Sequence, residues 1–303
     1  MKRHAERGMK RHAERGMKRH AERGMKRHAE QGVKRASGSL VAGALLITGV
    51  LLAALVSFVW TPYDPTVVDP AARMLHPSAA HWLGTDDFGR DIFSALLVGA
   101  RTTLLVGFVA TAIAATLGIP VGVAAGLRPG RTDEVLMRGN DVLLAFPALL
   151  LAIVFAAVWG GSTVTAMVAL GLGSAPSFAR VARAGTRQVA AHDYILAARA
   201  AGRRPGAIAR RHVLPNISSA LIVQASVTFA IAVLAEAALS YLGFGTPPPT
   251  PSWGRMLQES QPYLYLQPAV MLWPGLAIAL TVLGFNLLGD GLRDRLDPKS
   301  VRQ

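Results

Sequence analysis

The sequence offers few residues that could carry out covalent chemistry. It contains no cysteine, which excludes thiol catalysis, disulfides and cysteine metal sites. The metalloprotease pattern HExxH, the nucleophile pattern GxSxG and the phosphate-loop pattern GxxxxGK followed by Ser or Thr are all absent. No constellation of a nucleophile with a base stands out. We therefore expect that the chain is not an enzyme and does not hydrolyse ATP by itself.

Four histidines in the N-terminal tail invite a metal-site interpretation. Residues 1–32 are four copies of a basic octapeptide, and its histidines are His4, His12, His20 and His28. On a helix, eight steps turn each histidine roughly 80° past the previous one, so the four would not share a face. We predict no metal site and a solvated cytoplasmic tail over residues 1–39. Because each copy begins with methionine, the sequence does not fix which of them is the natural translation start, and Met25 is one candidate.

Isolated ionisable residues are the remaining candidates. Glu236 is the only acid well inside an apolar run, and such acids usually face a bundle interior or a cavity. Both a path or gate role and a structural role are open for it. Asp86, Asp87 and Arg90 lie in a segment rich in turn formers. Asp86 or Asp87 is expected to cap the next helix, with ion pairs inside the loop. The alternative is that Asp86, Asp87 and Arg90 meet a substrate-delivering protein or line the outer mouth.

Long uncharged runs must position these residues. The first run, Leu40–Trp60, has 21 residues and would span roughly 31 Å as a helix, which matches a bilayer core and exceeds a signal-peptide apolar region. Prolines within the runs are expected to be tolerated. The pattern predicts an all-α integral membrane protein with six transmembrane helices. The other five runs are Thr102–Leu127, Val142–Trp159, Thr163–Ala179, Val213–Ala235 and Ser260–Gly289.

The distribution of basic residues predicts the orientation. Of the 32 Lys and Arg residues, 28 fall in the tail, after the second and fourth runs, and at the C-terminal end. Both termini are therefore expected to be cytoplasmic. The net charge of +14 is then a topology signal and does not indicate nucleic-acid binding. The expected organisation is a tail (1–39), a first helix (40–60), an extracytoplasmic segment (61–101) and a five-helix core (102–303) with a cytoplasmic loop at 180–216.

The loop at 180–216 has the highest arginine density outside the tail. Residues 194–202 read as a short helix closed by Gly202. A second short helix is expected over residues 205–212, with Pro215 breaking it before the fifth span. From the pattern alone, the loop is either a compact cytoplasmic knob or only a positive charge that enforces topology.

Family resemblance favours the knob. The spacing of two alanines, a glycine and a Leu-Pro pair resembles the EAA loop of ABC importer permeases, whose coupling helices sit in a groove of the ATPase subunit. The matching positions are Ala197, Ala198, Gly202, Leu214 and Pro215. Leu196 replaces the family's glutamate and His212 its isoleucine, which removes one expected salt bridge but not docking by shape and apolar contact.

Two further segments narrow the resemblance. Residues 81–101 and residues 236–254 are similar to the corresponding segments of C-type permeases in the dipeptide, oligopeptide and nickel group. The resemblance implies an importer-type permease fold in a bacterial cytoplasmic membrane. It also implies a sister permease, two ATPase subunits that bind ATP and Mg²⁺, and an extracytoplasmic substrate-binding protein, with no cofactor in this chain.

The substrate stays open at this level. Short peptides are the leading expectation, while nickel, glutathione-like compounds and glycosides remain alternatives because relatives share these motifs. Two function classes compete with an importer permease. An ion-coupled secondary transporter would be expected to carry several intramembrane acids or inverted repeats, and a membrane enzyme would need clustered His, Asp or Glu at a membrane face. The sequence shows neither pattern.

Overall fold

The computed structural model describes residues 38–296 and is helical throughout that part of the chain, apart from loops and an isolated bridge between Thr85 and Asp91. After a first span at Gly38–Val59, the helices are η1 (Pro70–Ala72), α2 (Ile92–Leu127), α3 (Arg131–Leu144), α4 (Ala148–Trp159), α5 (Thr163–Ala190), α6 (Asp193–Ala200), α7 (Pro205–Ile208), the π-helical turn η2 (Ala209–Val213), α8 (Leu214–Tyr241), α9 (Trp253–Ser260), η3 (Gln261–Tyr263) and α10 (Pro268–Leu296).

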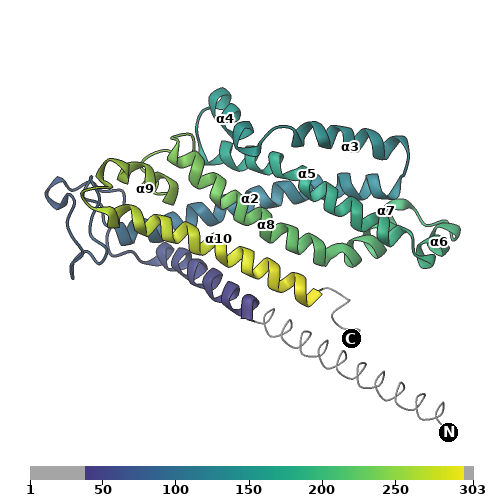
Figure 1. Cartoon of the computed structure of the whole chain (residues 1–303), viewed down its shortest axis with the longest axis horizontal. Helices are drawn as coiled ribbons and strands as arrows, with labels where there is room; N and C mark the ends of the chain where they lie inside the picture. The colour runs from purple at the N-terminus through teal and green to yellow at the C-terminus, as the bar shows by residue number, and fades with distance from the viewer. Residues whose placement is uncertain (1–37, 297–303) are drawn as a thin grey trace, which may run out of the picture.

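The centre of the bundle is the pairing of α2 with α5 (Figure 1). Two glycines of α2 allow the two backbones to approach closely, because a Cβ at Gly118 would lie 2.2 Å from the Ala175 carbonyl oxygen. A Cβ at Gly122 would lie equally close to the Ala179 carbonyl oxygen. Small residues four apart are the usual device for close helix packing in membranes. Helix α8 packs against both members of this pair, and α10 packs chiefly against α8.

Five of the described helices are long and apolar enough to cross a membrane, and the pair α3–α4 makes a sixth if it is counted as one span. The start of the first span, the end of α10 and helix α6 lie towards one end of the bundle, whereas residues 61–91 and α9 lie at the other (Figure 1). This arrangement fits the predicted six-helix fold with both chain ends on the cytoplasmic side. The octapeptide tail and its histidines lie outside the described residues.

The third predicted span, Val142–Trp159, is not one helix. Helix α3 ends at Leu144, α4 begins at Ala148, and the two are bent by 75°. Pro147 explains the break, since a proline disfavours the helical conformation of the residue before it and cannot donate a backbone hydrogen bond. The polar helix α3 is instead held along α5 by Asp133, whose carboxylate accepts hydrogen bonds from Arg183 at 2.5 and 2.7 Å.

The second span also differs from its predicted bounds. It begins at Ile92 instead of Thr102, because Asp91 provides a cap for the helix there. The fourth and fifth spans run on past their predicted ends, to Ala190 and Tyr241. The second and fifth helices exceed their uncharged runs because a single charged residue, Arg101 or Glu236, ends the run without ending the helix.

Candidate functional site

The cytoplasmic end of the molecule is built around the short helix α6. The side chain of Ile195 in α6 is fully buried and packs in a cluster with Ile208 and Val213. This packing anchors the loop to the bundle. The opposite side of α6 is free, with Leu196 54% exposed and Ala197 also exposed. A small, partly apolar surface on a fixed support is what a docking element requires.

Gly202 ends α6 as predicted. Its φ of +73° lies in the left-handed region that favours glycine, and its N–H donates to the Arg199 carbonyl at 2.9 Å. The next residue, Arg203, donates to the Ala198 carbonyl at 3.1 Å, which completes a Schellman-type cap. This turn reverses the chain towards α7 and sets the shape of the loop.

The expected break at Pro215 does not occur. Residues Pro205–Tyr241 form one helix of 37 residues that qualifies as a single candidate span. The π-helical turn at Ala209–Val213 makes this possible, because the N–H of Leu214 donates to the Ala209 carbonyl five residues back. Pro215, which has no N–H to donate, comes directly after this wider turn, and the helix continues through it. The loop is therefore continuous with the fifth span.

The outer end is organised by the buried guanidinium of Arg90. Its Nε donates to Asp86 Oδ2 at 2.7 Å, and its terminal amino group pairs with Glu259 of α9. Glu259 also accepts from Arg255 at 2.7 Å. Burial alone would lower the pKa of Arg90, but the carboxylates of Asp86 and Glu259 outweigh it and hold that pKa above its usual value. The network joins residues 61–91 to α9.

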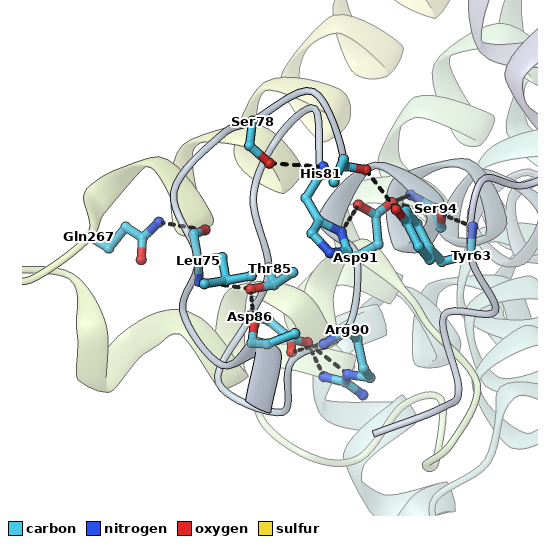
Figure 2. Close-up of polar contacts among 12 residues, drawn as sticks. Tyr63, Leu75, Ser78, His81, Thr85, Asp86, Arg90, Asp91, Ser94 and Gln267 are labelled. Atoms are coloured by element: carbon cyan, nitrogen blue, oxygen red, sulfur yellow. Dashed lines mark hydrogen bonds and ion pairs between the residues drawn. The ribbon is translucent and has the colours of Figure 1, made fainter. Parts of the chain in front are cut away.

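The prediction that Asp86 or Asp87 caps the second span is wrong. Asp91 caps it, with Oδ2 accepting from the backbone N–H of Ser94 at 2.8 Å (Figure 2). Asp86 instead closes its own turn by accepting from the N–H groups of Phe88 and Arg90. Asp87 pairs with Arg73. The cap must be the residue directly before the helix, and the helix starts later than either aspartate allows.

His81 and Thr85 complete the outer loop, and sequence reasoning gave neither a role of its own. His81 Nδ1 lies 3.1 Å from Asp91 Oδ1 (Figure 2). Thr85 is fully buried; its hydroxyl accepts from the Leu75 N–H at 2.8 Å and donates to a backbone carbonyl. The turn-rich composition could have indicated such tethers, but not their partners, which lie elsewhere in the loop.

Glu236 lies in α8 and is 1% exposed. Its Oε1 accepts from Ser240 Oγ at 2.7 Å, and that hydroxyl in turn accepts from the Thr246 N–H at 3.1 Å. Among the described residues its Oε2 has no hydrogen-bond partner. The carboxyl group thus ties the end of α8, through Ser240, to the loop that follows it.

Comparison with known proteins decides the family. The model of the family "binding-protein-dependent transport system inner membrane component" matches residues 118–302. The dipeptide transport system permease protein DppC of Alkalihalophilus pseudofirmus is 42% identical over 86% of this chain and 85% of its own length. This chain is an ABC importer permease of the dipeptide/nickel family. The nickel transport system permease protein NikC of Escherichia coli is 37% identical, over 86% of this chain and 94% of its own.

The permease fold is also seen in a solved structure. The inward-facing MetNI methionine ABC transporter has a chain that is 22% identical, with a TM-score of 0.54, and the match covers 65% of this permease and 94% of that chain. The likeness supports the helical architecture. Family membership and the apolar helices together make this permease a multi-pass protein of the bacterial inner membrane, a transport subunit and not an enzyme.

Proposed function

We propose that this permease imports di- or oligopeptides. It would act with a sister permease, two ATPase subunits that bind ATP and Mg²⁺, and an extracytoplasmic substrate-binding protein. The observation that carries the proposal is that permeases for a dipeptide and for the tripeptide glutathione are 42% and 44% identical to this chain, against 37% for a nickel permease. Nickel import by the same architecture is the second candidate.

The exposed side of α6 is the proposed ATPase contact. Ala197 and Gly202 are both exposed and small, and a Cβ added at Gly202 would meet nothing within 4 Å in this chain. Leu196 and Tyr194 flank them, 54% and 44% exposed. An apolar side chain at position 196 favours a docking contact made by shape and apolar burial instead of an ion pair.

The anchored side of the same loop would carry the movement. Ala198 and Leu214 are half-buried against the cluster formed by Ile195, Ile208 and Val213, and Pro215 lies in the first turn of α8. Closure of the ATPase subunits on nucleotide would therefore displace α8 as a rigid body together with the loop. Alternating access then needs no covalent chemistry in the permease.

Glu236 is proposed to hold the outer end of α8 in one arrangement during this movement. Its bond to Ser240 and the bond from Thr246 to that serine fix the loop leading to α9. Arg90, paired with Asp86, ties the outer loop to the same region through Glu259. Asp87 pairs with Arg73 instead, and it would lie near the face that a delivery protein approaches.

Reconstitution tests the substrate. The permease, its sister subunit and the ATPase subunits are placed in proteoliposomes with the binding protein, and uptake of a labelled dipeptide, an oligopeptide, glutathione and Ni²⁺ is measured with and without ATP. ATP-dependent peptide uptake is expected. Uptake of Ni²⁺ alone would assign the nickel alternative. Uptake driven by an ion gradient without ATP would mean that the chain is a secondary transporter.

A further inference from the structure

Arg101 lies at the outer boundary of the membrane-spanning region without a carboxylate partner. Its Nε donates to Ser57 Oγ of the first span at 2.5 Å, and its guanidinium carbon lies 4.0 Å from the centre of the Phe58 ring. None of the ion pairs between residues 38 and 296 includes it. No carboxylate of the described residues neutralises this half-buried charge, so an anionic group from outside the chain could add a charge-assisted partner.

The guanidinium lines an open groove of about 400 Å³. The polypeptide that follows the first span forms the other wall, with Thr61 and Thr66 supplying hydroxyls and Asp64 a carboxylate. Asp64 Oδ1 accepts from the N–H and hydroxyl of Thr66 at 2.8 and 2.6 Å, and these bonds lower the pKa of Asp64 below its usual value. The groove therefore presents a fixed positive group and a fixed negative group.

One face of α2 continues from the groove into the lipid-facing surface. Val98 and Arg101 line the groove, and Leu105 and Phe108 follow at the three- and four-residue spacing that places side chains on one face. Leu105 is 53% exposed and Phe108 is 69% exposed. Phe58 of the first span, 69% exposed, borders the same surface. The polar groove thus opens above a track of exposed apolar side chains.

We propose that this groove binds the headgroup of an outer-leaflet phosphatidylethanolamine. The phosphate would pair with Arg101, the primary ammonium with Asp64, and an acyl chain would lie along Leu105 and Phe108. Membrane phosphates are recognised by basic pockets at the helix ends, and arginine is the side chain best suited to a phosphate. The site is separate from the coupling loop and does not depend on which substrate is carried.

The two charges predict a lipid preference. Phosphatidylethanolamine satisfies both Arg101 and Asp64 with charged groups. Phosphatidylglycerol offers the phosphate and neutral hydroxyls but no cation, and phosphatidylcholine offers an ammonium that cannot donate hydrogen bonds. We therefore expect phosphatidylethanolamine to bind most tightly. Loss of one charge-assisted contact should weaken binding roughly ten- to a hundred-fold, the range typical of hydrogen bonds to charged groups.

Native mass spectrometry of the full-length permease, purified with its partner subunits and delipidated, tests this preference by titration with each lipid. Arg101→Gln should weaken binding of all three lipids, and Asp64→Asn should remove the preference for phosphatidylethanolamine while leaving phosphate binding. Arg73→Gln is the matched control, because that outer-face arginine is already paired with Asp87, and it should change neither result.

Unchanged lipid binding in Arg101→Gln overturns the proposal. A structure of the assembled transporter in which a carboxylate of another subunit pairs with Arg101 also overturns it. If Arg101→Gln does not fold, Asp64→Asn decides alone. A preference for phosphatidylethanolamine that survives Asp64→Asn would refute the site, and its loss would support it.

Discussion

Replacing Gly202 by valine changes the backbone preference of the coupling loop without creating a clash inside the chain. Gly202 has φ +73°, and a Cβ there would have no atom of the chain within 4 Å. The left-handed conformation costs a residue with a Cβ about 1–2 kcal/mol. That cost reduces the population of the native turn roughly 5- to 30-fold relative to its alternatives. The bundle itself, in which Gly202 takes no part, should keep its stability.

The assay compares uptake with ATP hydrolysis in proteoliposomes that contain the complete transporter. Gly202→Val is expected to lower the amount of substrate imported per ATP hydrolysed several-fold, while membrane insertion and the melting temperature stay unchanged. Gly202→Asn should keep most of the coupling, because asparagine tolerates the left-handed conformation.

Gly206→Val is the matched control for side-chain bulk. Gly206 lies in the same loop, has no positive φ, and has equally open space around it. If Gly206→Val uncouples transport as strongly as Gly202→Val, added bulk and not backbone strain is responsible. Full coupling in Gly202→Val would refute the role of the turn altogether.

Two other predictions concern the frame and the outer network. Gly122→Val should destabilise the bundle by about 3 kcal/mol or more, because its Cβ would lie 2.2 Å from the Ala179 carbonyl oxygen. Gly139→Val is the control, because a Cβ there meets open space and the variant should fold normally. Thermal unfolding in detergent compares the two variants. Arg90→Gln should cost about 1–3 kcal/mol, since it leaves the partly buried Asp86 without its cation and Glu259 with Arg255 alone. Adding Glu259→Gln should recover part of that loss in a double-mutant cycle, and strictly additive effects would contradict the network.

Sequence reasoning located most of the spans because long uncharged runs have few alternatives to a transmembrane helix. It failed where helix and apolar run do not coincide. Pro147 breaks a run that looks uniform, and Pro215, which looks like a break, lies in a helix that a π-helical turn keeps continuous. The sequence shows where each proline lies, but it does not show whether the helix continues through that proline or is interrupted at it.

The sites divide in a similar way. The close packing at Gly118 and Gly122 of α2 and the left-handed turn at Gly202 both depend on short-range spacing, which the sequence displays directly. The partners of Arg90 could not be predicted in this way, because Glu259 lies far away in the sequence and is brought to Arg90 only by the position of α9 in the folded chain. The burial of Glu236 likewise depends on residues that return to α8 from the following loop.

The continuous helix from Pro205 to Tyr241 also has a mechanical meaning. Its 37 residues form a lever arm about 55 Å long, with the coupling loop at one end and the Glu236–Ser240 bond near the other. Tilting such an arm by about 5° at the cytoplasmic end would sweep its far end through about 5 Å. Under the proposed coupling, a small tilt where nucleotide acts would displace the outer end of α8, and the Glu236–Ser240–Thr246 bonds would carry the loop that leads to α9 along with it.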